Sequence, residues 1–336
     1  MRVDQNIFQN SDFKSIYNSV YNTQNLKIGT LELNLRCNLS CIFCSREAHV
    51  FKKSENLILP EILSFIEDKD VVVFCGGEVL LDSRLPYLLE YCKKRGKKTS
   101  LISNGIPFSD SKICKDTLEN LDFLTLSITS SDPKIYNFMT GSDQFSLFQK
   151  GLENIMKDPH EKNLYKSINI VLLNSNIKYL QDIPLFFEGL GMHSVFLYSL
   201  LYPVYLGRLL DFPREYPDPT SEIFQKNLIN LCNFLKLKNK IIRFENMSSC
   251  FIPKIVADFV DSEENYGKHS FYIKKINNKL ISYTRDSIVE TYKKSPQCEF
   301  CLKKNYCKGL PEVAKILFGN KITPFKENNE ENKCII

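Results

Sequence analysis

The amino-acid sequence predicts an α/β fold built on a parallel sheet, and two observations carry this prediction. Short β-branched or apolar runs alternate with helical patterns along the chain, as in repeated strand-helix units joined by right-handed crossovers. A chain of 336 residues with 43% hydrophobic content is also long and apolar enough for a large core. The predicted strands lie near residues 28–33, 71–75, 98–102, 123–128, 167–173 and 194–199.

Helical patterns fill the gaps between these strands. Residues 144–157 carry apolar side chains on one helical face: Phe145, Phe148, Leu152, Ile155 and Met156. A similar pattern over residues 221–236 includes Cys232, which is most simply a core thiol. Residues 271–285 contain two alternating runs around Asn277-Asn278, which predicts a hairpin.

Three cysteines follow the first predicted strand in the spacing C-x3-C-x2-C: Cys37, Cys41 and Cys44. An iron-sulfur cubane that only carries electrons normally has four protein thiolates. Three thiolates leave one iron open, and an open metal position is where chemistry takes place. The alternatives are a zinc knuckle or a group of buried thiols, although zinc ribbons usually bring together two separated C-x2-C pairs.

This loop resembles the signature of the radical SAM superfamily. The resemblance implies a 4Fe-4S cluster on the three cysteines, with S-adenosylmethionine (SAM) chelating the open iron. It also implies reductive cleavage of SAM to a 5'-deoxyadenosyl radical, which takes a hydrogen from the substrate. The six strand-helix units resemble the partial (β/α)6 TIM-type barrel of that family, where reactive groups lie at the C-terminal strand ends. Phe43, directly before the third cysteine, resembles the aromatic residue that the family usually has near the adenine of SAM.

A Gly76-Gly77-Glu78 tripeptide follows the second predicted strand directly. Two glycines allow the backbone to approach a ligand where a Cβ would clash. The tripeptide resembles the family motif that binds the amino group of the methionyl moiety of SAM. The alternative interpretation is a tight turn with a solvated glutamate.

Small polar residues follow or end the later strands, and they resemble the family's SAM-pocket positions: Ser103, Asn104, Ser127 and Asn169. Gly207, beyond the sixth strand, resembles the glycine that lets the backbone approach adenine. Polar residues at such positions are equally often satisfied core or turn residues.

A second set of cysteines lies near the C-terminus, with Cys298, Cys301 and Cys307 in the spacing C-x2-C-x5-C and Cys250 upstream as the natural fourth ligand. Four thiolates suit electron transfer or a structural role, and structural zinc is the alternative. The spacing resembles the SPASM and twitch auxiliary-cluster domains. Because Pro311 stands where a full SPASM domain has a further cysteine, the resemblance implies one auxiliary 4Fe-4S cluster.

The predicted organisation has four parts. They are an N-terminal extension (1–26), a radical SAM core barrel (27–215), a small C-terminal auxiliary iron-sulfur domain of SPASM or twitch type (216–325) and a disordered tail (326–336).

Composition sets the expected location and partners. The N-terminus lacks an apolar signal-peptide core, no run of eighteen apolar residues occurs, and the net charge of +5 includes no long basic block. We therefore expect neither membrane nor nucleic-acid binding. Twelve cysteines without an export signal favour metal ligation in a reducing cytoplasm.

The predicted function is that of a radical SAM enzyme. The SPASM-like architecture favours modification of a ribosomally made peptide or a protein side chain. One alternative is a radical SAM enzyme acting on a small molecule or cofactor precursor. Another is a non-catalytic iron-sulfur protein that transfers electrons or senses redox state. The expected partners are a peptide or small-molecule substrate and an electron donor such as ferredoxin or flavodoxin.

Overall fold

The computed structural model describes residues 27–44, 57–204, 207–259, 261–262, 270–276, 279–284, 292–305, 307 and 309–321. The predicted N-terminal extension, the predicted tail and the predicted turn at Asn277-Asn278 lie outside these residues.

The described strands form a long sheet in the order β10-β9-β1-β2-β3-β4-β5-β6-β7-β8, and neighbours from β1 to β8 are parallel. The α/β prediction is confirmed, and all six predicted strands are present. Their bounds, with those of the added strands, are β1 Ile28–Asn34, β2 Val71–Gly76, β3 Lys98–Ser103, β4 Phe123–Ser127, β5 Tyr165–Val171, β6 Val195–Leu201, β7 Ile241–Glu245, β8 Asp261–Ser262, β9 Ser270–Ile276 and β10 Lys279–Thr284.

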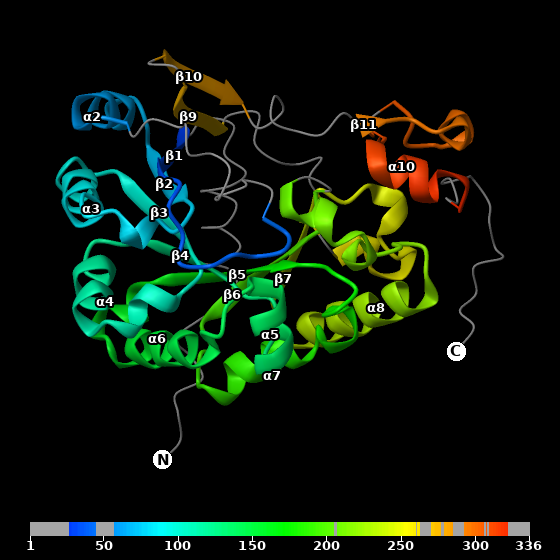
Figure 1. Cartoon of the computed structure of the whole chain (residues 1–336), viewed down its shortest axis with the longest axis horizontal. Coiled ribbons are helices and arrows are strands. Elements are labelled where there is room, and N and C mark those ends of the chain that lie inside the picture. Colours follow the sequence, from blue (N-terminus) through cyan, green and yellow to red (C-terminus); the bar gives the residue numbers. More distant parts are fainter. Residues whose placement is uncertain are drawn as a thin grey trace.

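The helices follow the strands, and most of them form an arc along one side of the sheet from α2 to α8 (Figure 1), whereas α5 lies at the cysteine loop. Their bounds are α2 Leu59–Glu67, α3 Leu85–Lys94, α4 Ser111–Leu118, α5 Pro133–Thr140, α6 Phe145–Lys157, α7 Asp182–Gly189 and α8 Glu222–Leu237. The predicted helix over 144–157 is confirmed as α6, in which Phe145, Phe148, Leu152 and Ile155 are buried. Cys232 is fully buried in α8, as predicted.

The sheet continues past the sixth strand at one edge and before the first strand at the other. β7 pairs with β6, so the sheet runs through the predicted domain boundary at residue 215. β9 and β10 pair antiparallel, which confirms the predicted hairpin pairing, and β9 lies parallel to β1. Sequence periodicity did not indicate that either segment would join the main sheet.

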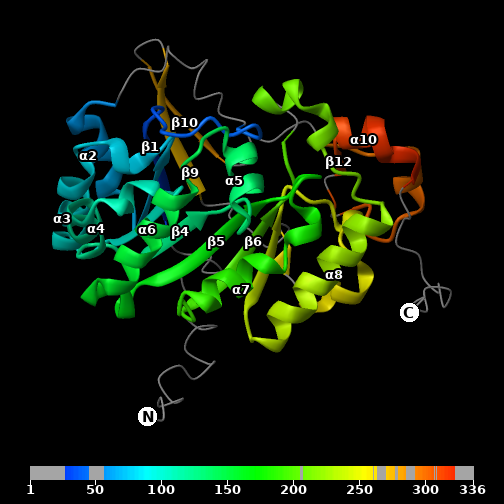
Figure 2. The same ribbon diagram turned by 60° about the horizontal axis from the view of Figure 1, so that its bottom comes forward.

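The last described segment forms a small unit beside the α8 end of the sheet (Figure 2). β11 (Tyr292–Lys293) pairs antiparallel with β12 (Leu310–Pro311), and α10 (Glu312–Phe318) follows directly. In the part of the chain that the structure describes, no helix is long and apolar enough to cross a membrane.

One face of the sheet carries a polar layer. Strand registers align Ser127 on β4 with Asn169 on β5, Ser199 on β6 and Arg243 on β7. Residues in one layer of such a sheet point to the same side because side chains alternate along each strand. This layer lies beneath the C-terminal strand ends, where the candidate site is found.

Candidate cluster and cofactor site

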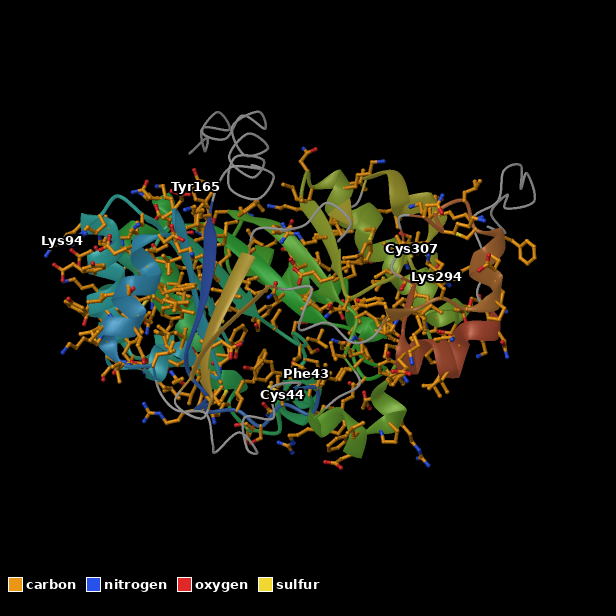
Figure 3. The ribbon with its side chains drawn as sticks, turned by 90° about the horizontal axis from the view of Figure 1, so that it is seen from above. Phe43, Cys44, Lys94, Tyr165, Lys294 and Cys307 are labelled. Carbon is orange, nitrogen blue, oxygen red and sulfur yellow. The ribbon has the colours of Figure 1, made fainter. Side chains whose placement is uncertain are left out.

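A cavity opens at the C-terminal ends of the parallel strands, where α/β barrels place their reactive groups. Phe43 and Cys44 lie toward the middle of the molecule in the view of Figure 3. The cavity brings together most of the predicted site residues: Cys37, Cys41, Phe43, Cys44, Gly76, Gly77, Ser103, Asn104 and Ser127. Its other walls include Thr129, Tyr136, Thr140, Val171, Leu201, Tyr202 and Asn246.

Helix α5 holds the cysteine loop in place. The backbone N–H of Ser40 donates to the carbonyl of Thr140 at 2.9 Å, and that of Ile42 donates to Met139 at 2.9 Å. These carbonyls belong to the last turn of the helix and have no intrahelical partner of their own. Arg208 also donates to the carbonyl of Ser40. The loop is therefore fixed by hydrogen bonds that do not depend on a bound cluster.

The thiols of the loop are partly buried and lie close enough to influence one another's pKa values. Burial raises the pKa of the Cys37 thiol, and burial together with the thiolates of Cys37 and Cys44 raises the pKa of Cys41. Thiols with raised pKa values need a cation to hold them as thiolates, and the iron of a cluster would supply one. Among the described residues no three His, Cys, Asp or Glu side chains are arranged around one metal ion. The thiolates of a cubane are spread over the cluster, so they need not converge on one ion.

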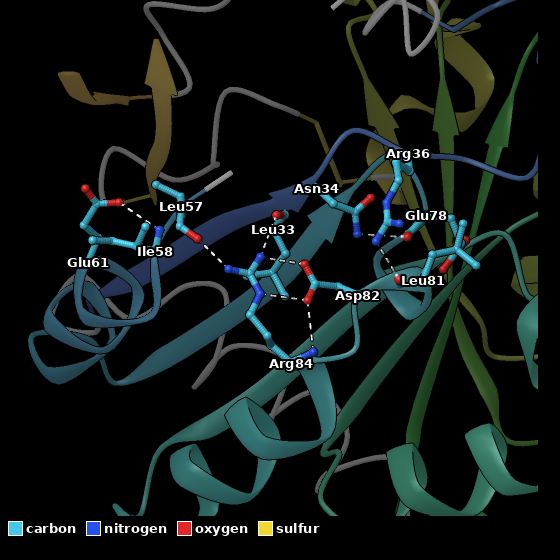
Figure 4. Close-up of polar contacts among 10 residues, drawn as sticks. All are labelled: Leu33, Asn34, Arg36, Leu57, Ile58, Glu61, Glu78, Leu81, Asp82 and Arg84. Atoms are coloured by element: carbon cyan, nitrogen blue, oxygen red, sulfur yellow. Dashed lines mark hydrogen bonds and ion pairs between the residues drawn. The ribbon is translucent and has the colours of Figure 1, made fainter. Parts of the chain in front are cut away.

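Gly76 and Gly77 are required by close contact with the end of β1. The N–H of Gly77 donates to the carbonyl of Asn34 at 2.8 Å, and the N–H of Glu78 donates to that of Arg36 at 2.7 Å. A Cβ on Gly76 would lie 2.2 Å from the Asn34 oxygen, and one on Gly77 would lie 2.4 Å from the Arg36 oxygen. The side chains of Asn34 and Arg36 reinforce this junction through the carbonyls of Glu78 and Leu81 (Figure 4).

The Glu78 side chain points into the protein instead of forming the cavity wall. It is fully buried and accepts hydrogen bonds from the Asn104 N–H at 2.8 Å and the Ser103 hydroxyl at 2.9 Å. Burial raises its pKa to about 7, although these hydrogen bonds favour the charged form. The carboxylate thus ties the end of β3 to the glycine turn. A direct contact with SAM remains a prediction.

Asn169 and Gly207, two further predicted SAM contacts, are also not among the residues that line the cavity. Asn169 lies in register with Ser127 in the polar layer. Gly207 has a φ of 60°, which a glycine adopts without strain, and it leads into Arg208 at the cysteine loop. Their roles toward SAM stay predictions.

Two buried hydroxyl groups in the cavity wall suggest that the cavity accepts a polar ligand. The hydroxyls of Thr129 and Tyr136 find no hydrogen-bond partner in the described structure. Leaving such a group unsatisfied costs about 1–3 kcal/mol. The Tyr136 ring is held by stacking on Phe148, and its pKa is raised by burial and by the neighbouring Cys41 thiolate. A ligand with several polar groups beside the cysteines, as SAM is, fits this wall.

The far wall of the cavity leads toward the second set of cysteines. Tyr202 is fully buried, and its ring centroid lies 5.5 Å from that of Phe251. Asn246 follows β7 directly, with a φ of 55°. Sequence reasoning missed both residues. Asn246 could have been found, because it is a polar residue just beyond the strand-like run from Ile241 to Phe244.

The region that contains the cysteine loop and the glycine turn is similar to a known protein family. Residues 31–183 match the model of the radical SAM superfamily. The chain contains a radical SAM domain. The family implies a 4Fe-4S cluster and SAM as cofactors, and the loop of Cys37, Cys41 and Cys44 falls inside the matched residues.

Relatives of the radical SAM domain act on different substrates according to their names. A probable GTP 3',8-cyclase of Methanococcus aeolicus is 26% identical over 181 residues, which cover 50% of this chain and 58% of that protein. An Fe-coproporphyrin III synthase of Methanosarcina barkeri is 26% identical over 179 residues, 52% of this chain and 43% of that protein. The match thus spans about half the length of these relatives.

The fold of the radical SAM domain and its C-terminal neighbour is also similar to that of Streptococcus suis SuiB. The SuiB structure with S-adenosylmethionine aligns with a TM-score of 0.56 and 13% identity, covering 96% of this chain and 83% of SuiB. The structure of SuiB with the precursor peptide SuiA aligns with a TM-score of 0.52 and 15% identity, covering 98% of this chain and 83% of SuiB.

All four cysteines of the second predicted set line one cavity outside the radical SAM domain: Cys250, Cys298, Cys301 and Cys307. Burial and the other three thiolates raise the pKa of Cys250 to about 12. Gly309 shapes this cavity, with a φ of 101° and its N–H donating to the Cys307 sulfur at 3.4 Å. The structure thus brings Cys250 to the C-terminal cysteines, as the sequence predicts.

Proposed function

We propose that this chain is an enzyme that binds a 4Fe-4S cluster through Cys37, Cys41 and Cys44 and binds SAM in the adjoining cavity. When bound, these groups supply reductive cleavage of SAM and a 5'-deoxyadenosyl radical for hydrogen abstraction. The observation that carries the proposal is the joint placement of the three thiols, the glycine turn and small polar side chains around one cavity. Three protein thiolates leave one iron of a cubane for a ligand.

The residues around the cavity have distinct tasks in this proposal. Gly76 and Gly77 expose backbone to the methionyl end of SAM, while Glu78 keeps that turn fixed to Asn104. The hydroxyls of Tyr136 and Thr129 gain partners when the ligand enters. Fixing the ligand through groups already held in place lowers the entropic cost of reaching the reactive geometry.

We assign the second cavity to one auxiliary 4Fe-4S cluster on Cys250, Cys298, Cys301 and Cys307. Support comes from the coupling of the Cys250 thiol to the other three, which places all four within electrostatic reach. Four thiolates leave no open iron, so this cluster would accept or pass electrons and would not bind SAM.

The proposed substrate is a peptide or a protein side chain. The supporting observation is the fold similarity to SuiB, whose structure holds a precursor peptide, over nearly the whole of this chain. The second candidate is a small-molecule substrate, and the sequence matches to the GTP cyclase and the coproporphyrin synthase favour it.

The test is product formation under strict anaerobiosis. Reconstituted protein is reduced with dithionite and given SAM, and 5'-deoxyadenosine is quantified by chromatography. We expect multiple turnovers or a stoichiometric burst. An intact cluster that yields no 5'-deoxyadenosine would contradict the enzymatic proposal and favour a non-catalytic iron-sulfur protein. Deuterium transfer into 5'-deoxyadenosine from labelled candidate peptides or nucleotides then separates the two substrate classes.

A further inference from the structure

The cavity of the second cysteine set is lined by lysines as well as thiols. Lys294, Lys303 and Lys304 form part of the same wall as the four cysteines. Lys294 and Lys304 are exposed, and Lys303 is partly exposed. The Lys294 ammonium donates to the carbonyl of Lys304 at 2.6 Å, and that of Lys304 donates to the carbonyl of Glu299 at 3.3 Å. The lysines therefore form a basic rim around the site.

Two large apolar side chains are exposed on the same cysteine loop. Phe300 is 75% exposed and directly precedes Cys301, and Leu302 is 54% exposed and directly follows it. A small apolar centre with a charged rim is the composition of a protein-protein contact, in which aromatic residues carry much of the affinity. We call Phe300, Leu302, Lys294, Lys303 and Lys304 the C-terminal surface.

The C-terminal surface is also directly connected to the SAM cavity through the protein. Cys250 lies on the wall of the second cavity, and Asn246 lies on the wall of the first. Three residues lie between them, so their Cα atoms are at most about 15 Å apart. The ring of Phe251, the residue after Cys250, lies 5.5 Å from that of Tyr202 in the wall of the first cavity, measured between ring centroids. A partner bound at the C-terminal surface would thus sit close to a redox centre that leads inward.

We infer that the C-terminal surface is the docking site of a small acidic one-electron carrier protein of the flavodoxin or ferredoxin type. This inference rests on the proposed function, because it needs the auxiliary cluster as the group that exchanges the electron. The reduced carrier loses one electron, the auxiliary cluster gains it, and no atom is transferred. Complementary charge suits such partners, whose contacts are small, short-lived and electrostatically steered.

The experiment compares two charge-reversal variants of the reconstituted protein. One is Lys294→Glu/Lys303→Glu/Lys304→Glu. The control is Lys94→Glu/Lys112→Glu/Lys150→Glu, which changes the net charge equally on helices α3, α4 and α6; Lys94 lies at the opposite end of the molecule from Lys294 (Figure 3). Recombinant flavodoxin is the probe, and its Kd and the flavodoxin-driven rate of 5'-deoxyadenosine formation are measured.

We expect the first variant to bind flavodoxin about tenfold more weakly or worse and to lose the flavodoxin-driven rate in proportion. Its dithionite-driven rate should equal that of the wild type, because dithionite needs no docking surface. The control should stay within about twofold of the wild type in both assays, and the wild-type Kd should rise with salt.

Other outcomes would overturn the inference. The inference fails if the first variant binds flavodoxin as tightly as the wild type. It also fails if both variants lose flavodoxin binding equally, or if the first variant loses peptide turnover alone. If the charge reversal lowers iron content, Phe300→Ala/Leu302→Ala decides instead, with several-fold weaker flavodoxin binding expected at wild-type iron content. A wild-type protein that fails to cleave SAM with dithionite counts against the proposed function, while the flavodoxin Kd values still decide the docking surface.

Discussion

The two cysteine sites of this protein differ in how they are built. The thiols of the first site come from one loop, and backbone hydrogen bonds to α5 and β2 fix that loop. The thiols of the second site come from two segments, since Cys250 lies nearly fifty residues before Cys298. The first site adjoins a cavity at the strand ends that has both polar and apolar walls, and the second lies in a cavity lined by three lysines.

This difference teaches that one type of ligand residue can serve two tasks in one chain. In the proposed function, three thiols beside an open cavity would leave one iron for a ligand that reacts, whereas four thiols would leave a cluster that only exchanges electrons. The surroundings of the thiols decide the task. Four variants would test this comparison, beginning with the largest expected effect.

Replacing all three cysteines of the first site by alanine should abolish SAM cleavage, because no cluster can form there. Iron per reconstituted chain should fall from about eight to about four. Chromatography of 5'-deoxyadenosine and iron analysis check both results. A fall from about four to about zero would instead leave the second site to zinc or to no metal.

Cys301→Ala should leave dithionite-driven SAM cleavage intact and stop turnover of the true substrate. The first loop keeps its own hydrogen bonds to α5, so its cluster should still form. The measurement is the ratio of modified substrate to 5'-deoxyadenosine, which should fall by at least about tenfold. Full product formation by this variant would show that the second site is not needed.

Gly76→Ala should destabilise the first site strongly, because the new Cβ would lie 2.2 Å from the Asn34 oxygen and the residue has a φ of 151°. We expect the free energy of unfolding of the apo protein to fall by about 4 kcal/mol or more. Gly189→Ala is the matched control, since nothing lies within 4 Å of its Cβ position. Its effect on urea unfolding should stay below about 1 kcal/mol; comparable losses in both variants would argue against the contact with β1.

Glu78→Gln should change the pH dependence of stability. The folded-state pKa of about 7 lies above the ordinary 4.5, so the folded state binds the proton more tightly than the unfolded state. The unfolding free energy of the apo wild type should therefore fall by roughly 3 kcal/mol as pH rises through this window. The variant should lack this fall in urea titrations from pH 5 to 8. Glu119→Gln, at an exposed carboxylate, is the control and should behave as the wild type.

Sequence reasoning located the strands and the cysteine sites because both depend on local patterns. The run Val71–Cys75 marks a buried strand, and its end fixes the position of Gly76 and Gly77. The sequence could not show that Glu78 turns inward, because that depends on the Asn104 N–H lying opposite it. Carboxylate burial is a tertiary property that a tripeptide does not encode.

Non-local contacts account for the other differences. β9 joins the sheet next to β1, more than two hundred residues earlier, and no periodicity predicts that pairing. Tyr202 and Tyr136 resemble ordinary core aromatic residues in the sequence, yet they line the cavity beside the first three cysteines. The lysines at the second site became significant only once the structure placed them beside the thiols.

The short segment from Asn246 to Cys250 has a consequence for maturation. Its first residue forms part of the wall of one cavity, its last forms part of the wall of the other, and Asn246 holds a left-handed conformation with little freedom to adjust. We therefore expect insertion of a metal group at Cys250 to change the position of Asn246 in the wall of the first cavity. We expect preparations loaded at only one site to differ from the mature protein in substrate fit as well as in redox behaviour, so the order of loading matters.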